Sequence, residues 1–178
     1  MSEKSNYGLL AEFDTASALY RACEAVRDEG FTKWDAHTPF PVHGLENAMG
    51  VGRSFLPWIV LVMGIAGAVS GFMLQTWVHT EAYALVISGK PYFAWQAFMP
   101  VTFECGILFA SFGAVFGMFI INGLPTLYHP VFGSERFARV TDDKFFISIE
   151  AADPRFDSEG TKQLLENAGA THVESLEA

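Results

Sequence analysis

Two long stretches of the chain are apolar and almost free of charge. Residues 55–78 contain no charged side chain, and residues 98–121 contain Glu104 as their single charged residue. A helix needs about 20 apolar residues to cross the hydrocarbon core of a bilayer. The pattern therefore predicts two transmembrane helices, at about 55–78 and 98–121.

The connection between the two predicted spans is short, so they form a hairpin. Residues 79–97 carry tyrosine, tryptophan and lysine, which favour the membrane interface. A hairpin places the segments before and after it on one side of the membrane. Arg53, Arg136 and Arg139 flank the spans on that side, against Lys90 alone in the loop. The positive-inside bias therefore predicts that both termini are cytoplasmic.

The segment before the hairpin has the pattern of a strand, a helix and a second strand. Residues 7–12 and residues 31–37 are the predicted strands. The helix between them is indicated by Asp14 or Thr15 as N-cap, by Leu19, Cys23 and Val26 at helical spacing, and by Gly30 as C-cap.

The segment after the hairpin repeats this order with similar lengths. Residues 145–150 are a predicted strand, residues 159–168 a helix and residues 171–176 a final strand. Leu164 and Leu165 are expected to point inward from this helix, and Gly169 to end it.

Two such β-α-β units are what a ferredoxin-like α+β fold requires. Neither half, at roughly 35 to 45 residues, is large enough to be stable alone. We therefore expect one split domain. Residues 1–53 form its first half and a linker, residues 54–121 form the inserted hairpin, and residues 122–178 form a linker and the second half. Two separate small modules are the alternative.

Composition excludes several classes of function. The chain has 20 acidic and 11 basic residues, with no run of Lys or Arg, so a nucleic-acid partner is excluded. Its two cysteines form no CxxC or CxxCH motif, and neither predicted span contains a histidine. These absences predict no iron–sulfur cluster, haem c or membrane haem b in this chain.

Acidic pairs outside the hairpin are the remaining candidates for a catalytic or metal site. Asp142 lies next to Asp143, and Asp153 lies close to Asp157. Basic residues neighbour both pairs, so we expect solvated loop residues here. No catalytic, cofactor-binding or metal-binding residue is predicted.

Each predicted span carries a stripe of small residues on one face. Small residues allow helix backbones to approach closely in lipid. We expect these stripes to pack the hairpin on itself. They comprise Gly64, Gly67, Ala68 and Gly71 in the first span, and Gly106, Ala110, Gly113 and Gly117 in the second.

Glu104 is a carboxylate inside an apolar span, and helical geometry points it away from the small residues. It lies ~9 Å inside the loop-side end of the run that begins at residue 98. Ser111 lies almost directly below it, and His79 is a candidate hydrogen-bond partner at the same membrane side. Hydration at the interface, contact with another subunit, quinone or water-filled cleft, and a proton relay all stay open.

Six segments, in this order around the two spans, carry a resemblance that covers nearly the whole chain. They are YGLLAEFD at 7–14, PFPVHGLENAMG at 39–50, PVTFE at 100–104, YHPVF at 128–132, RFARVTDDKFFISIEAADPRFD at 136–157 and NAGATHVE at 167–174. With these segments the sequence resembles the D subunit of bacterial alternative complex III, a quinol:electron acceptor oxidoreductase.

The resemblance implies an accessory, structural membrane subunit in the bacterial inner membrane. It implies that haem c and iron–sulfur clusters belong to partner subunits, and that multi-span partners bind and oxidise quinol. The hairpin then packs beside these quinol-oxidising subunits in a respiratory or photosynthetic electron-transport chain. The alternative is a subunit that contributes to proton movement through Glu104. An independent sensor or transporter is a third reading, but two helices are too few to enclose a path unless the protein oligomerises.

Overall fold

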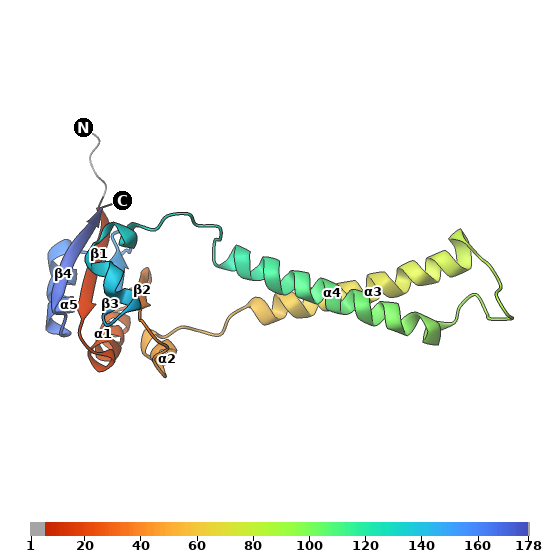
Figure 1. The fold of residues 1–178 in the computed structure, drawn as a ribbon, viewed down its shortest axis with the longest axis horizontal. Coiled ribbons are helices and arrows are strands. Elements are labelled where there is room, and N and C mark those ends of the chain that lie inside the picture. Colours follow the sequence, from red (N-terminus) through yellow and green to blue (C-terminus); the bar gives the residue numbers. More distant parts are fainter. Residues whose placement is uncertain (1–5, 178) are drawn as a thin grey trace, which may run out of the picture. The chain divides into compact units, whose positions relative to one another are not determined.

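The computed structural model describes residues 6–177, and these form two compact units (Figure 1). One unit is split in the sequence: it contains the described chain up to Gly52 and again from Leu127. The other unit runs from Arg53 to Thr126 and contains the two long apolar helices.

The split unit is built on one four-stranded antiparallel sheet with the strand order β2-β3-β1-β4. The two central strands come from opposite sides of the hairpin, and Ala11 on β1 lies opposite Ile147 on β3. Segments far apart in the sequence therefore share one sheet. The strands are β1 (Asn6–Phe13), β2 (Trp34–His37), β3 (Phe145–Glu150) and β4 (His172–Glu177).

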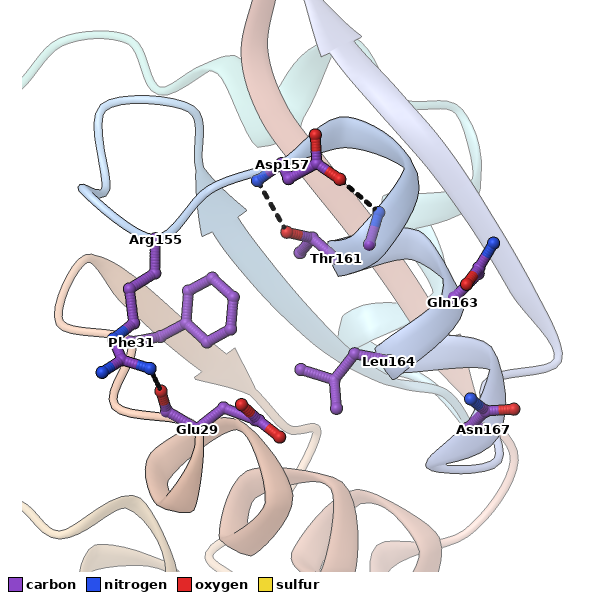
Figure 2. A pocket seen from close by; sticks show the side chains of 9 residues that line it. Glu29, Phe31, Arg155, Asp157, Thr161, Gln163, Leu164 and Asn167 are labelled. Carbon is purple, nitrogen blue, oxygen red and sulfur yellow. Dashed lines mark hydrogen bonds between the residues drawn. The ribbon is translucent and has the colours of Figure 1, made fainter.

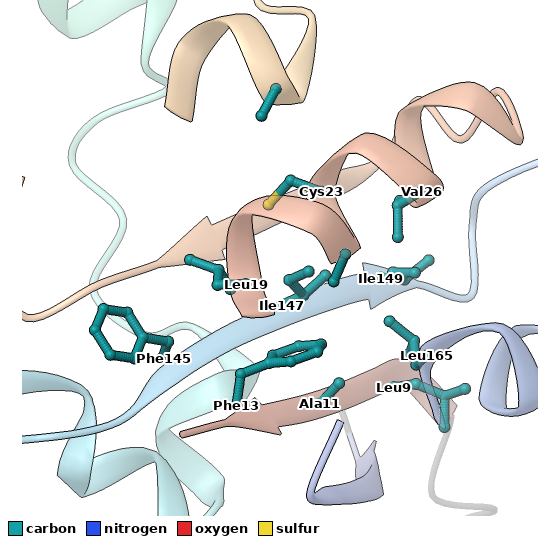
Figure 3. Close-up of a cluster of buried hydrophobic side chains, with 12 residues drawn as sticks. Leu9, Ala11, Phe13, Leu19, Cys23, Val26, Phe145, Ile147, Ile149 and Leu165 are labelled. Atoms are coloured by element: carbon teal, nitrogen blue, oxygen red, sulfur yellow. The ribbon is translucent and has the colours of Figure 1, made fainter. Parts of the chain in front are cut away.

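The main hydrophobic core lies between one face of this sheet and the helices α1 (Ala16–Asp28), α2 (Leu45–Met49) and α5 (Ser158–Asn167) (Figure 3). The side chains alternate along β1, so every second residue enters this core. The fully or almost fully buried members include Leu9, Ala11, Phe13, Leu19, Cys23, Val26, Ile147, Ile149 and Leu165.

The ends of α1 and α5 agree with the capping residues in the sequence. The hydroxyl of Thr15 accepts a hydrogen bond from the N–H of Ala18, so Thr15 is the N-cap of α1. Gly30 and Gly169 follow the two helices with φ of +83° and +98°. Glycine adopts this left-handed conformation without steric cost, so it suits the position after a helix.

A second, smaller core covers the other face of the sheet. Val131 and Phe137 come from two short 3-10 helices, η2 (Pro130–Gly133) and η3 (Arg136–Thr141), and pack against Leu10, Phe146 and Leu176. From the sequence, a linker is expected in this region. The structure shows instead that these residues bury the second face of the sheet.

Two details of the split unit correct the sequence analysis. The strand expected at 31–37 begins only at Trp34, because the backbone N–H groups of Thr32 and Lys33 donate to the carboxylate of Asp153. These groups are therefore not available to a strand ladder. Asp153, expected in a solvated loop, is 5% exposed. The expectation of a solvated side chain was therefore wrong for Asp153.

The second unit contains the helices α3 (Leu56–Trp77) and α4 (Trp95–Ile121). A π-helical segment, η1 (Val78–Ala82), continues α3, so each of the two apolar helices extends over 27 residues. Both are long and apolar enough to cross a membrane. α4 begins three residues before the predicted span, and this earlier start places Pro100 beyond the first turn of the helix.

Candidate functional site in the helical hairpin

The two long helices pack along a seam in which glycines of each helix face the opposite helix. A Cβ atom at Gly67 would lie 2.4 Å from the carbonyl oxygen of Cys105, and one at Gly113 would lie 2.9 Å from the Cβ of Met63. Gly71 and Gly117 are similarly confined, at 2.8 Å from Cys105 Cβ and Leu56 Cδ1. At Gly67, where the close atom belongs to the backbone, no side chain larger than hydrogen fits without moving the helices apart, whereas at Gly117 the end of the Leu56 side chain would have to shift.

The seam is looser at the other small residues. A Cβ atom at Gly64 would make ordinary contact with Ala110 at 3.5 Å, and one at Gly106 would make the same contact with Ala68. An apolar cavity of about 380 Å³ opens beside them. Both stripes of small residues thus face the opposite helix. Larger residues, Met99, Phe103 and Ile107, also line the cavity.

Gln75 joins the helices by hydrogen bonds that the sequence analysis missed. Its side-chain amide donates to the carbonyl of Phe98 at 3.0 Å and to the hydroxyl of Thr102 at 3.4 Å, and also to Gly71 on its own helix. The signal was a lone amide within an apolar run, which requires a partner when it is buried in lipid.

The three polar residues singled out in the hairpin do not form a cluster of mutual hydrogen bonds. The ring nitrogen Nδ1 of His79 pairs with the carbonyl of Gln75 at 2.9 Å, and its ring packs beside Phe98. The Ser111 hydroxyl donates to the carbonyl of Ile107 on its own helix. Glu104 is exposed and has no hydrogen bond or ion pair with any described residue.

Most of the apolar surface of the hairpin remains uncovered. Only 11% of the most apolar window of each helix is buried within the structure. Exposed large side chains point outward along both helices, including Trp58, Leu61, Val62, Ile65, Met73, Phe103, Leu108, Phe116 and Ile120. In water such a surface would be strongly unfavourable, so it requires lipid or protein around it.

In the described part of the split unit, Asp153 is the carboxylate that accepts the most hydrogen bonds. Its Oδ2 accepts from the N–H groups of Thr32 and Lys33, both at 2.7 Å, and from the Thr32 hydroxyl, while Oδ1 accepts from the N–H of Arg155. Burial alone would raise the pKa of Asp153. The hydrogen bonds to its charged form outweigh burial and lower the pKa to about 2. This carboxylate therefore ties a loop of the first half to a loop of the second.

A second buried carboxylate lies on the face of the sheet covered by the 3-10 helices. Glu12 is 5% exposed and forms ion pairs with Arg136 at 2.9 Å and Lys144 at 3.5 Å. These two ion pairs join β1 to the segment between the hairpin and β3. Its arrangement fits a structural role, because opposite charges compensate the burial of the carboxylate.

Titratable side chains also gather near the end of this face. Tyr7 pairs with His129 Nε2 at 3.1 Å and donates to Glu150, and His37 pairs with the hydroxyl of Ser148. Burial, followed by the charge and hydrogen bond of Glu150, raises the pKa of Tyr7 to about 12. Burial lowers the pKa of His37. A tyrosine and a histidine with these shifts are neutral at pH 7.

An open pocket of about 380 Å³ lies between the end of α1 and the start of α5 (Figure 2). Three of the side chains that line it are engaged in local structure. Arg155 donates to the backbone carbonyl of Glu29, Asp157 accepts from the N–H of Gly160, and the Thr161 hydroxyl accepts from the N–H of Asp157. Asp157 is the N-cap of α5, which explains its conformation without a ligand.

Within residues 6–177, no group of three or more His, Cys, Asp or Glu side chains is arranged to hold a metal ion. The free cysteines Cys23 and Cys105 lie in different units, in the main core and in the hairpin seam.

Comparison with known proteins identifies the family. A search of curated proteins finds no match to the chain. The sequence model of the family described as "Alternative complex III, ActD subunit" matches residues 7–175, which include both units and both sides of the hairpin. The chain therefore belongs to the ActD subunit family of alternative complex III.

Proposed function

We propose that this chain is a structural subunit of alternative complex III that carries no redox cofactor of its own. The observation that carries the proposal is the uncovered apolar hairpin in a chain that the ActD family matches from residue 7 to residue 175. The hairpin uses its small residues for its own seam and leaves large apolar side chains facing outward. Those side chains are available to stabilise neighbouring multi-span subunits.

In this proposal the hairpin crosses the inner membrane twice, and both termini are cytoplasmic. Each helix of 27 residues is ~40 Å long, enough for a hydrocarbon core of ~30 Å with some tilt. Arg53, Arg136 and Arg139 against Lys90 supply the charge bias for the orientation.

The split unit then acts as a single ferredoxin-like domain with the hairpin inserted between its halves, at about residues 54–121. The antiparallel strand order β2-β3-β1-β4 supports this assignment, as does the order of strand, helix and strand in each half. The hydrogen bonds of Asp153 and the ion pairs of Glu12 both connect residues from opposite sides of the hairpin. We propose that this domain covers the cytoplasmic face of a neighbouring subunit.

The redox centres of the complex belong to partner subunits in this account. The partners are multihaem cytochrome c subunits, an iron–sulfur subunit and multi-span quinol-oxidising subunits. This division of labour agrees with Glu12 and Asp157, whose carboxylates are engaged in an ion pair and in a capping hydrogen bond. The electron transfer and quinol oxidation of the complex therefore proceed elsewhere.

Affinity capture tests this function. Membranes from the native host are solubilised in mild detergent, the protein is captured through a C-terminal tag, and the retained subunits are identified by mass spectrometry. We expect cytochrome, iron–sulfur and multi-span subunits in one particle. Recovery of the chain alone, as a homo-oligomer, would contradict the proposal.

A role in proton movement is the second candidate, and the exposed, unpartnered carboxylate of Glu104 favours it. A relay also requires further polar groups along its path. The Ser111 hydroxyl, which continues that face, donates to its own helix backbone. Glu104→Gln in the assembled complex separates the candidates: unchanged quinol-linked proton transfer with intact assembly would remove the relay.

A further inference from the structure

Glu104 differs from the other polar side chains inside the hairpin. The hydroxyl and amide side chains beyond the first turn of each helix all have hydrogen-bond partners within the hairpin: these are Ser70, Gln75, Thr76, Thr102 and Ser111. Glu104 has none among the described residues. Among the hydroxyl, amide and carboxylate side chains of α3 and α4 beyond the first turn, Glu104 alone lacks a partner among the described residues.

The chain has no suitable charge of its own to offer Glu104. Between residues 54 and 121 the only lysine or arginine is Lys90, which lies in the loop between the helices and makes no ion pair with Glu104 in the described structure. Snorkelling to the interface is a property of the long lysine and arginine side chains, whereas glutamate is short. A charged carboxylate at this depth therefore needs a partner from outside the chain.

The surroundings of Glu104 form a continuous uncovered strip on α4. Val101, Leu108, Ser111 and Val115 lie within about 60° of Glu104 around the helix axis, at 100° per residue. All of them are exposed. The buried glycines of the seam lie on the opposite side of α4. We call this strip the Glu104 face.

We propose that the Glu104 face packs against a transmembrane helix of a larger subunit that brings an arginine or lysine side chain to Glu104. The inference rests on the proposed function, because the partner is a subunit of the same complex. A cation matches an ionised carboxylate, and a charge-assisted hydrogen bond is stronger than one between neutral groups. The apolar residues above and below Glu104 exclude water and lipid headgroups from the pair.

Quantitative co-purification tests the proposed pair. The chain is tagged at its C-terminus in the native host, and the complex is extracted first in mild and then in harsher detergent. The amounts of the large subunits are measured relative to the tagged chain for wild type, Glu104→Gln, Glu104→Leu and Glu104→Lys. Ser111→Ala is the matched control, because it lies on the same face and its hydroxyl bonds only to its own backbone.

Loss of one partner from a buried ion pair is strongly destabilising, so Glu104→Leu is expected to lower retention roughly tenfold or more. Glu104→Lys places two cations together and lowers retention further. Glu104→Gln keeps an acceptor and loses less, while the Ser111→Ala control behaves as wild type. Equal retention of wild type and Glu104→Leu would overturn this inference alone. Failure of the wild-type chain to retain any subunit would overturn the proposed function as well.

A cross-linking measurement avoids any folding defect of the variants. A photoreactive amino acid replaces Leu108 on the Glu104 face or, as a control, Val69, which is exposed on α3. We expect the probe at position 108 to label a transmembrane helix with a basic residue at the depth of Glu104. Labelling of lipid alone, or of a helix without such a residue, would overturn the proposal.

Discussion

Asp153 offers the sharpest test of the split unit, because it joins loops from opposite sides of the hairpin. We expect Asp153→Asn to destabilise this unit while leaving its overall fold intact. Asparagine keeps the size of the side chain but removes its charge and replaces one acceptor oxygen by an NH₂ group. That group would face the N–H donors of Thr32, Lys33 or Arg155.

The magnitude follows from the pKa of Asp153, which falls from an ordinary value of 3.8 to about 2 in the fold. A tenfold change in proton affinity corresponds to about 1.4 kcal/mol, so the charged form contributes about 2 kcal/mol to folding at neutral pH. Because the pKa is lower in the folded state, this contribution is complete above about pH 5. It is lost as the pH falls through 3.8 towards 2.

The buried thiol of Cys23 provides the assay in the full chain, reconstituted in detergent or nanodiscs. Cys23 is 0% exposed, and burial, followed by the charges of Asp35 and Glu24, raises its pKa to about 12. It is therefore alkylated only when the core opens. Mass spectrometry of the modified peptides separates Cys23 from Cys105.

We expect Asp153→Asn to increase the rate of Cys23 alkylation by between tenfold and one hundredfold at pH 7. Asp142→Asn is the matched control: Asp142 is exposed, and its carboxylate has no hydrogen-bond partner in the described structure. Equal protection of Cys23 in wild type and Asp153→Asn would refute the role assigned to this carboxylate. An acid titration followed by circular dichroism should show the two proteins converging below about pH 2.

Three further substitutions test the packing within the two units. Gly67→Ala should lower the stability of the hairpin in thermal denaturation by about 1–3 kcal/mol, because the added Cβ would lie 2.4 Å from a carbonyl oxygen of the opposite helix. Gly64→Ala is the control that we expect to be tolerated, because its Cβ would lie 3.5 Å from the Cβ of Ala110. Gln75→Leu removes hydrogen bonds between the helices and should lower the unfolding free energy of the hairpin by about 0.6–2 kcal/mol in a detergent unfolding titration. An unchanged unfolding free energy would show that these bonds are dispensable. Glu12→Gln removes the ion pair with Arg136 and should destabilise the split unit by about 1.5–3 kcal/mol, measured by the protection of Cys23 from alkylation. In the double variant Glu12→Gln/Arg136→Met, restored protection would support the charge argument, and additive losses of stability would contradict it.

Local sequence signals predicted the elements of the split unit well where neighbouring residues determine them. The helix at α1 followed from the spacing of Leu19, Cys23 and Val26, and all three are buried. Thr15 and Gly30 at its ends act through hydrogen bonds to residues a few positions away. Such short-range interactions are visible in a single sequence.

Long-range partners explain what the sequence did not predict. The start of β2 depends on Asp153, which lies about 120 residues away from Thr32 and Lys33. The second core depends on Val131 and Phe137, which are isolated apolar residues in short 3-10 helices without a periodic pattern. Neither feature has a local signature, because the partner is supplied only when the two halves of the chain meet.

In the hairpin, composition predicted the two apolar helices but not their ends or the details of the seam. The π-helical extension of α3 over Val78–Ala82 and the earlier start of α4 at Trp95 depend on hydrogen bonds at the helix termini. The spacing of the glycines indicated a packing face, whereas the close approach of Gly67 to Cys105 required coordinates. The exposed position of Glu104 agrees with its helical angle relative to Gly113 and Gly117.

Deletion of this chain from the native host, followed by measurement of quinol oxidation per assembled complex, tests the structural role most directly. We expect less complex in the membrane and faster loss of subunits in detergent. The haem content and quinol turnover of each particle that does assemble should be unchanged. Fully assembled particles that lack a redox centre, or that retain their subunits but have lost quinol turnover, would contradict a purely structural role for this chain.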